Sequence, residues 1–228
     1  MQQYFIKETL KVGTYVTLDD EILFHLKRVL RKMKGYEFRL IDKENKAFLC
    51  TLEDDRAKVI SAIKEERELR HELVLALALI KHDRFEWAIQ KATELGVSKI
   101  IPLISERVMI KDDSEVKRIK RYQKIAKEAA EQSLRHRIPE ITSFMSLDEV
   151  ASLPVKNKLL AYEKEEEEKL EDYDDDTLIV IGPEGGFSKK EYQLLMERGF
   201  SSISLGKRIL RAETAAIAAV CIIGRGME

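Results

Sequence analysis

Two glycine-containing segments in the C-terminal part of the sequence carry residue types that could bind a ligand. The first, IGPEGGFSKKE, covers residues 181–191, and the second, LGKRILRAETA, covers residues 205–215. Each follows a short apolar run that is typical of a buried strand. Glycine has no side chain, so backbone groups in such segments can contact a ligand directly. The alternative interpretation is a glycine turn that simply joins a strand to a helix.

The second segment also places charged residues beside its glycine. Arg208 and Arg211 follow Gly206, and Glu213 and Thr214 fall in the first turn of an alanine-rich helix. Core packing explains the alanines, because small residues allow helices to pack closely. Core packing does not explain the charges, so this segment is the stronger candidate for a functional site.

Several common catalytic and binding motifs are absent from the sequence. It contains no G-x-x-x-x-G-K-[ST] phosphate loop, no G-x-G-x-x-G dinucleotide fingerprint and no G-x-S-x-G nucleophile elbow. Cys50 and Cys221 lie far apart, and the four histidines show no metal-ligand spacing. We therefore expect no metal site and no disulfide. Without a secretory signal layout or an apolar run of about 18 residues, we expect a cytoplasmic protein with no membrane segment.

The elements that position the two glycine segments are predicted from hydrophobic periodicity. From residue 72 onward, the strand-like runs ELVLALALI, KIIPLI, KLLAY, TLIVIG and SISLG alternate with helical patterns. The predicted helices cover residues 83–96, 116–137 and 188–198, and a last helix begins near Arg211. Asp83 with Glu86, and Ser188 with Glu191, have the spacing of capping boxes. This alternation predicts a mainly parallel sheet with helices on both faces, which binds ligands at the carboxyl ends of its strands.

The N-terminal part of the sequence has a different character. The runs YEFRLID and KAFLCTLEDD predict a strand pair, and AKVISAIKEERE predicts a further strand. A basic helix is predicted from about Asp20 to Lys32. These short strands indicate a small β-rich domain over residues 1–70, followed by an α/β domain over residues 71–228.

Charge is unevenly distributed along the chain, although the net charge is only −1. Residues 163–176 are strongly acidic and are interpreted as a solvated loop, so the remainder of the chain is positive. Basic residues cluster at 25–34, at 117–127 and at 135–137. Such clusters suit a polyanion such as RNA, although solvated helix faces are an equally good interpretation of any single cluster.

The two glycine segments, IGPEGGFSKKE and LGKRILRAETA, resemble the signature segments of the RsmE family. These proteins are SPOUT-class methyltransferases of small-subunit ribosomal RNA. The stretches HLKRVLR, QKATELGVSKIIPLISER and EAAEQSLRHRIPEI agree in kind and order, so the resemblance spans nearly the whole chain. The acidic insert after LLAYE departs from the family pattern and leaves the conformation of that loop open.

The resemblance implies an α/β fold with two domains and a cofactor. A small PUA-like RNA-binding β-barrel would precede a SPOUT-type α/β domain that contains a trefoil knot and a mainly parallel sheet. The family binds S-adenosylmethionine in the knot and acts as a homodimer. The expected cofactor-binding residues are Leu160, Ala161, Gly182, Pro183, Glu184, Gly185, Gly186, Leu205, Gly206, Ile209, Leu210, Arg211, Thr214 and Ala215.

The family product, a uridine methylated on N3, suggests roles for charged residues. Uracil N3 carries a proton at neutral pH and attacks poorly until that proton leaves. Arg211 would stabilise the resulting anion, and Glu213 or Glu184 would accept the proton. Each glutamate has the alternative role of ordering a loop or a helix N-terminus. The catalytic candidates are therefore Arg211 and Glu213.

Basic residues would then hold the RNA backbone. His25, Arg28 and Arg31 are spaced to share one face of a regular helix, and Arg135 and Arg137 could extend that surface. A structural role is the alternative for each. The expected partner is 16S ribosomal RNA or the assembled small ribosomal subunit.

Two other functions fit the same sequence. A transfer RNA ribose methyltransferase would keep the α/β fold and change the substrate, although the PUA-like half and RILRAET favour ribosomal RNA. A non-catalytic RNA-binding protein in ribosome assembly would bind no S-adenosylmethionine. Calorimetry with S-adenosylmethionine separates that last possibility from both enzymes.

Overall fold

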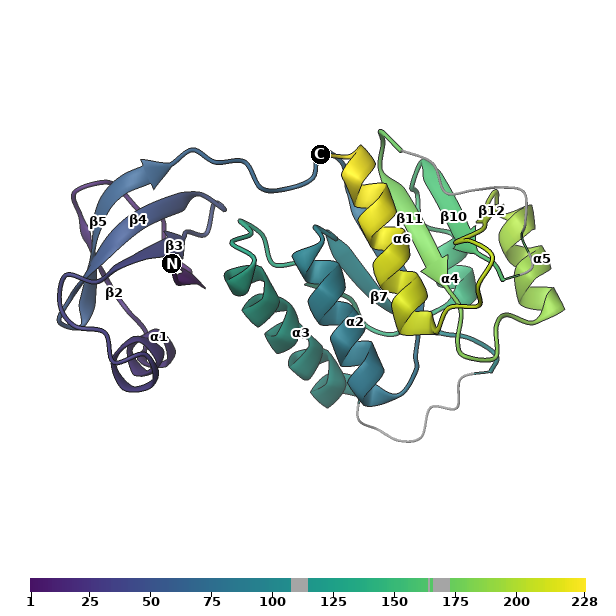
Figure 1. Cartoon of the computed structure of the whole chain (residues 1–228), viewed down its shortest axis with the longest axis horizontal. Coiled ribbons are helices and arrows are strands. Elements are labelled where there is room, and N and C mark those ends of the chain that lie inside the picture. The colour runs from purple at the N-terminus through teal and green to yellow at the C-terminus, as the bar shows by residue number, and fades with distance from the viewer. Residues whose placement is uncertain (108–114, 164, 166–172) are drawn as a thin grey trace. The chain divides into compact units, whose positions relative to one another are not determined.

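The computed structural model describes residues 1–107, 115–163, 165 and 173–228, and the chain divides into two compact units (Figure 1). The first unit contains Met1–Arg67 and Glu131–Arg137, and the second contains Glu68–Ala130 and Ile138–Glu228. Within the described residues, every helix is too short or too polar to cross a lipid bilayer.

The first unit is built on a five-stranded sheet in the order β1-β3-β4-β5-β2. The strands are β1 (Gln3–Phe5), β2 (Tyr15–Thr17), β3 (Glu37–Ile41), β4 (Ala47–Glu53) and β5 (Arg56–Ile63). β3, β4 and β5 pair antiparallel in sequence order, which confirms the predicted strand pair and the strand after it. Phe38, Leu40 and Leu52 are buried in its core.

The basic helix of the first unit is shorter than predicted and changes its winding. α1 (Asp20–Phe24) begins after Asp19, whose Oδ1 accepts a hydrogen bond from the Ile22 amide at 2.8 Å. The chain continues as the π-helix η1 (His25–Val29) and leaves helical geometry at Arg31, where φ is +53°. The predicted helix from about Asp20 to Lys32 is therefore confirmed at its start, but it continues as a π-helix and ends early, at Val29.

The second unit is a parallel sheet in the order β12-β10-β11-β6-β7-β8, with β9 also paired to β7. Its strands are β6 (Leu73–Ala78), β7 (Lys99–Ile104), β8 (Glu140–Ile141), β9 (Met145–Ser146), β10 (Asn157–Ala161), β11 (Thr177–Ile181) and β12 (Ser201–Ile203). All of these pairings are parallel, which confirms the predicted sheet. The very short strands β8 and β9 were not predicted, because two residues carry no periodic pattern.

Helices cover both faces of the parallel sheet, as predicted (Figure 1). The helices are α2 (His82–Glu94), α3 (Glu115–Gln132), α4 (Leu147–Ala151), α5 (Lys189–Glu197) and α6 (Ala212–Gly226). Leu73, Leu75 and Leu77 of β6 pack in one cluster with residues of α2, α3 and α6. The alternate residues of β6 pack in a second cluster with residues of α4 and α5.

The two predicted capping boxes have different outcomes. At the start of α5, Ser188 Oγ accepts from the Glu191 amide and Glu191 Oε2 accepts from the Ser188 amide, so this capping box is confirmed. At the start of α2, the N-cap residue is Lys81, and no side chain caps the helix. The box predicted from Asp83 and Glu86 is wrong, because Glu86 instead binds the guanidinium of Arg121.

Candidate active site

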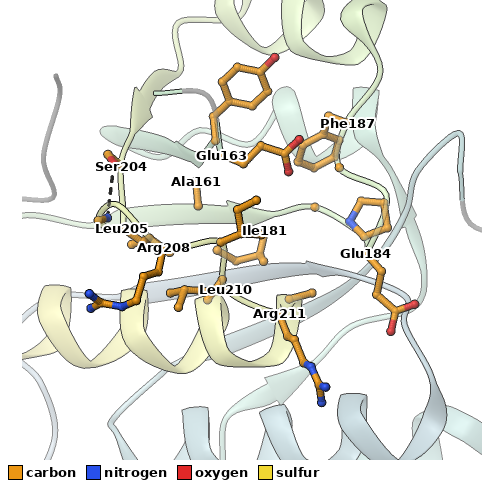
Figure 2. Close-up of a pocket in the computed structure, with 18 of the residues that line it drawn as sticks. Ala161, Glu163, Ile181, Glu184, Phe187, Ser204, Leu205, Arg208, Leu210 and Arg211 are labelled. Carbon is orange, nitrogen blue, oxygen red and sulfur yellow. Dashed lines mark hydrogen bonds between the residues drawn. The ribbon is translucent and has the colours of Figure 1, made fainter. Parts of the chain in front are cut away.

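Three loops leave the same edge of the parallel sheet and form a pocket. Ala161 of β10 lies in register with Ile181 of β11 and with Ile203 of β12, so the chain leaves all three strands side by side. The loops after β11 and β12 are the two glycine segments singled out in the sequence. They enclose a pocket of about 400 Å³ (Figure 2). Its lining residues are Arg84, Ala161, Tyr162, Glu163, Ile181, Gly182, Pro183, Glu184, Gly186, Phe187, Ser204, Leu205, Gly206, Lys207, Arg208, Ile209, Leu210, Arg211, Ala212 and Ala215.

Glycine is required at particular points of these loops. Gly186 and Gly206 have φ values of +66° and +108°, a region that residues with a side chain rarely adopt. At Gly182 the requirement is space, because a Cβ there would lie 3.0 Å from Cε2 of Phe187. The backbone of both segments is consequently open toward the pocket.

Arg84 contacts an acidic residue of each of the two glycine segments. Arg84, in the first turn of α2, places Nη1 2.5 Å from Oε1 of Glu184 in the first segment. Its Nε lies 3.7 Å from Oε1 of Glu213 in the second segment. The Glu213 side chain is 6% exposed, and its Oε2 has no hydrogen-bond partner among the described residues. Arg84 therefore compensates a nearly buried carboxylate while tethering the loop that carries Glu184.

The first glycine segment is held from its other side by the loop after β7. Arg107 donates from Nη1 to the carbonyl oxygen of Gly185. Glu191, the capping residue of α5, also accepts from the Glu106 amide at 2.8 Å. Arg107 Nη1 also donates to the carbonyl oxygen of Gly186 at 3.5 Å, and of the two glycines Gly186 lines the pocket.

Comparisons with known proteins agree with this geometry. Residues 67–224 match the RNA methyltransferase domain family, and residues 18–64 match the RNA methyltransferase PUA domain family. Ribosomal RNA small subunit methyltransferase E of Mesomycoplasma hyopneumoniae (strain 232) is 38% identical over 225 residues, which cover 95% of this chain and 96% of that protein. The chain belongs to the RsmE family.

Further similar proteins cover nearly the whole chain. Ribosomal RNA small subunit methyltransferase E of Bacillus subtilis (strain 168) is 31% identical over 100% of this chain and 98% of its own length. The Neisseria gonorrhoeae RsmE structure, bound to S-adenosyl methionine, is similar with a TM-score of 0.88 at 33% identity, covering 96% of this chain and 95% of that one. A putative methyltransferase from Legionella pneumophila, in complex with the same molecule, has a TM-score of 0.86 at 32% identity, covering 96% and 94%. These findings confirm the resemblance, the PUA-like domain and the α/β class, whereas the trefoil knot stays a prediction.

Most residues expected at the RsmE cofactor site line the pocket, and a few do not. Leu160 points into the sheet core, Gly185 lies outside the lining, and Thr214 is exposed on α6. Glu213 is buried behind Arg84 and is also outside the lining. Arg211 lines the pocket as the exposed N-cap residue of α6, and Figure 2 shows its side chain and that of Arg208 leaving the loop in different directions.

Several lining residues were not predicted from the sequence. Phe187 and Arg208 lie inside the two glycine segments. They would have been predicted if every residue of each segment had been counted as a candidate for the pocket lining. Tyr162 ends the strand-like run KLLAY and Glu163 follows it, so the strand-end rule also indicated these two residues. Arg84 is far away in the sequence, and only its place near the N-terminus of α2 brings it to the pocket.

The basic residues expected to bind RNA are not equivalent in the structure. Arg28, Arg31 and Arg137 are exposed, whereas Arg135 is only 3% exposed. Because the π-helix and the φ of Arg31 break regular winding, the shared helical face predicted for His25, Arg28 and Arg31 is wrong. The RNA-binding roles themselves stay predictions.

His25 makes a contact that was not expected from the sequence. Its Nδ1 lies 2.7 Å from the hydroxyl oxygen of Tyr4. Burial, followed by the charge of Glu131, raises the pKa of Tyr4, so the hydroxyl stays protonated and can donate to the imidazole. This bond gives His25 a packing role inside the first unit.

One group of possible metal ligands lies outside the pocket in the described part of the chain. Side-chain atoms of His71, Asp175 and Asp176 lie within 4.8 Å of one another. Asp175 pairs with Lys156, and Asp176 accepts from the Glu72 amide at 2.8 Å, so both carboxylates already have protein partners. The expected absence of a metal stays a prediction. Most of the acidic run, residues 164 and 166–172, lies outside the described residues.

Proposed function

We propose that this protein is an S-adenosylmethionine-dependent methyltransferase that methylates N3 of a uridine in 16S ribosomal RNA. The observation that carries the proposal is one pocket formed by both glycine segments at the strand ends of an RsmE-family chain. Relatives over nearly the full length are ribosomal RNA small subunit methyltransferases, and similar structures hold S-adenosyl methionine.

The pocket fits this methyl donor in size and chemistry. Its volume of about 400 Å³ falls within the range of roughly 300–1,000 Å³ that is common for small-molecule sites. Leu205, Ile209 and Leu210 offer apolar contacts for an adenine ring, and the open backbone of the glycine segments offers amide and carbonyl groups. When bound, the donor supplies an activated methyl group on a sulfonium.

The charged residues of the site would act on the uracil. Arg211 would hold the uracil oxygens and stabilise the N3 anion, a role supported by its position in the pocket lining and its exposure at the start of α6. Glu184 is paired with Arg84, so its carboxylate is already engaged by the protein. Glu213 keeps one oxygen without a partner among the described residues and is the proposed proton acceptor, although its carboxylate is nearly buried, contacts Arg84 and lies outside the pocket lining. Its second function is to hold Arg84 in place.

The N-terminal residues would present the RNA. Residues 1–70 form the proposed PUA-like RNA-binding domain, and residues 71–228 form the catalytic domain. Arg28, Arg31 and Arg137 are exposed and would contact phosphates, which orient RNA without reading bases. N3 lies on the Watson–Crick edge, so the target uridine must be unpaired or flipped out. We also propose that the protein is cytoplasmic, acts as a homodimer and needs no metal.

A direct test uses the purified full-length protein. Calorimetry measures S-adenosylmethionine binding, and mass spectrometry maps methylated nucleosides after incubation with 16S ribosomal RNA or with small subunits from cells that lack the protein. We expect binding and a new N3-methyluridine. Methylation of a ribose hydroxyl or of transfer RNA would contradict the proposed substrate, and absence of binding would contradict the proposed activity.

A further inference from the structure

The carboxylate of Glu163 occupies a distinctive position on the pocket wall. Glu163 follows the end of β10 by two residues, lines the pocket and is exposed. Figure 2 shows its carboxylate on the same side of the pocket as Phe187. A Cβ on Gly186 would lie 3.0 Å from Glu163 Oε1 and 3.1 Å from Oε2, so the missing side chain of Gly186 leaves room for this carboxylate.

Glu163 differs from the other carboxylate that lines the pocket. Glu184 is paired with Arg84 at 2.5 Å, so its negative charge is compensated. Glu163 has no hydrogen-bond or ion-pair partner within residues 1–107, 115–163, 165 and 173–228. A carboxylate at a partly enclosed wall attracts a cation more strongly than it would in bulk water. The pocket therefore presents one uncompensated negative charge beside its glycine loop.

We propose that Glu163 is an anionic subsite for a positive charge of the methyl donor. This inference rests on the proposed function. S-adenosylmethionine carries two positive groups, the sulfonium and the α-ammonium, whereas S-adenosylhomocysteine keeps only the α-ammonium. A carboxylate close to the sulfonium favours the donor over the product, and a carboxylate close to the ammonium favours both equally.

The test measures binding rather than turnover. Calorimetry on the full-length wild-type protein and on Glu163→Gln uses S-adenosylmethionine and S-adenosylhomocysteine as ligands. Glutamine keeps the shape of the side chain and removes its charge. We expect the Kd for S-adenosylmethionine to rise roughly tenfold, the size expected for loss of one charge-assisted contact.

Glu165→Gln is the matched control. Glu165 is two residues further along, lies outside the pocket lining and accepts a hydrogen bond from the Ser202 hydroxyl at 2.5 Å. This variant removes one negative charge from the same loop, so it measures how much the general negative charge of residues 163–176 contributes to ligand affinity. We expect the affinity of this variant for both ligands to stay within about twofold of wild type, because Glu165 lies outside the pocket lining and solvent screens charges at a distance.

Each possible result of the calorimetry supports or overturns a specific part of the proposal. A larger loss for S-adenosylmethionine than for S-adenosylhomocysteine supports contact with the sulfonium, and an equal loss for both supports contact with the ammonium. Unchanged affinity of Glu163→Gln for both ligands overturns the subsite, and so does an equal loss in Glu165→Gln. If the wild-type protein binds neither ligand, the proposed function fails together with the subsite, which separates this result from the others.

Discussion

The two sets of residues expected to be functional have very different outcomes in the folded chain. The glycine segments, 181–191 and 205–215, meet in one pocket, although α5 and β12 separate them in sequence. The basic residues of the first unit do not form the face expected of them. Arg28 and Arg31 lie on either side of the end of a π-helix, and Arg135 is buried.

The difference has a physical cause. Parallel strands in register deliver their carboxyl ends to one edge of a sheet, so loops that follow them must be neighbours. A helical face exists only while the winding stays at 3.6 residues per turn. One π-turn, such as that from His25 to Val29, rotates every later side chain away from the predicted direction. Strand-end sites are therefore more predictable than helix-face sites.

The largest expected effect tests whether the pocket contains the catalytic cation. Arg211→Ala should lower kcat for methyl transfer by roughly 10²–10³-fold, as seen when one preorganised donor to a developing anion is removed. The Kd for S-adenosylmethionine should stay near the wild-type value. Single-turnover kinetics and calorimetry measure the two quantities.

Arg198→Ala is the control for this prediction. Arg198 follows α5 and donates to the Ser152 hydroxyl at 3.0 Å, away from the pocket lining. Its loss should leave kcat within about twofold of wild type, because exposed polar contacts contribute little. Turnover near wild type in Arg211→Ala would show that the pocket and the catalytic cation are in different places.

The second prediction compares two neighbouring glycines. Gly186→Val should weaken S-adenosylmethionine binding by roughly 50-fold, because a β-branched residue is strained at φ +66° and its Cβ meets the Glu163 carboxylate. Gly185→Ala should change the Kd by less than about threefold, since its Cβ would lie 3.5 Å from Arg107, an ordinary contact. Equal effects at both positions would contradict the orientation of the loop.

The sequence predicted the parallel sheet and the pocket walls because their signals are local and repeated. β6 and β11 are buried over their full length, and β7 and β10 are apolar after their first one or two residues, as expected of strands covered on both faces. The capping box of Ser188 and Glu191 fixed the start of α5 from residue spacing alone. Each of these signals lies within a few residues of the element that it describes.

The features that the sequence did not predict depend on contacts between residues far apart in sequence. Arg84 reaches the pocket only because α2 begins at the edge where β11 and β12 end. Glu86 has a capping residue's spacing, yet a distant guanidinium, Arg121, outcompetes the helix end for its carboxylate. The long helix predicted to residue 137 ends at Gln132, and Leu134 takes a φ of +61°. The periodic pattern of a single segment carries no information about contacts with distant residues that compete with local ones.

The third prediction tests whether Arg84 couples the two glycine segments. Arg84→Ala should weaken S-adenosylmethionine binding roughly tenfold, because it releases Glu184 and leaves the Glu213 carboxylate nearly buried without its cation. A double-mutant cycle with Glu184→Gln isolates the pair. The Kd of the double variant should be close to that of Arg84→Ala alone. Purely additive losses would show that the two segments bind independently.

The smallest expected effect separates the exposed arginine from the buried one. Arg137→Ala should weaken RNA binding about two- to threefold and reduce the slope of log K against log[salt] by about 1, as expected for one lost phosphate contact. Its unfolding temperature should change little, because contacts of an exposed side chain contribute little to stability. Filter binding across a salt series provides the measurement.

Arg135→Ala should do the reverse, because Arg135 is only 3% exposed and its side chain is buried inside the first unit. We expect the free energy of unfolding to fall by about 1–3 kcal/mol, with the salt slope of RNA binding unchanged. If Arg135→Ala instead lowers the salt slope, the segment 131–137 must open when RNA binds. RNA binding would then complete the basic surface of residues 25–34 and 135–137. The pocket between the two glycine segments, in contrast, forms when the chain folds.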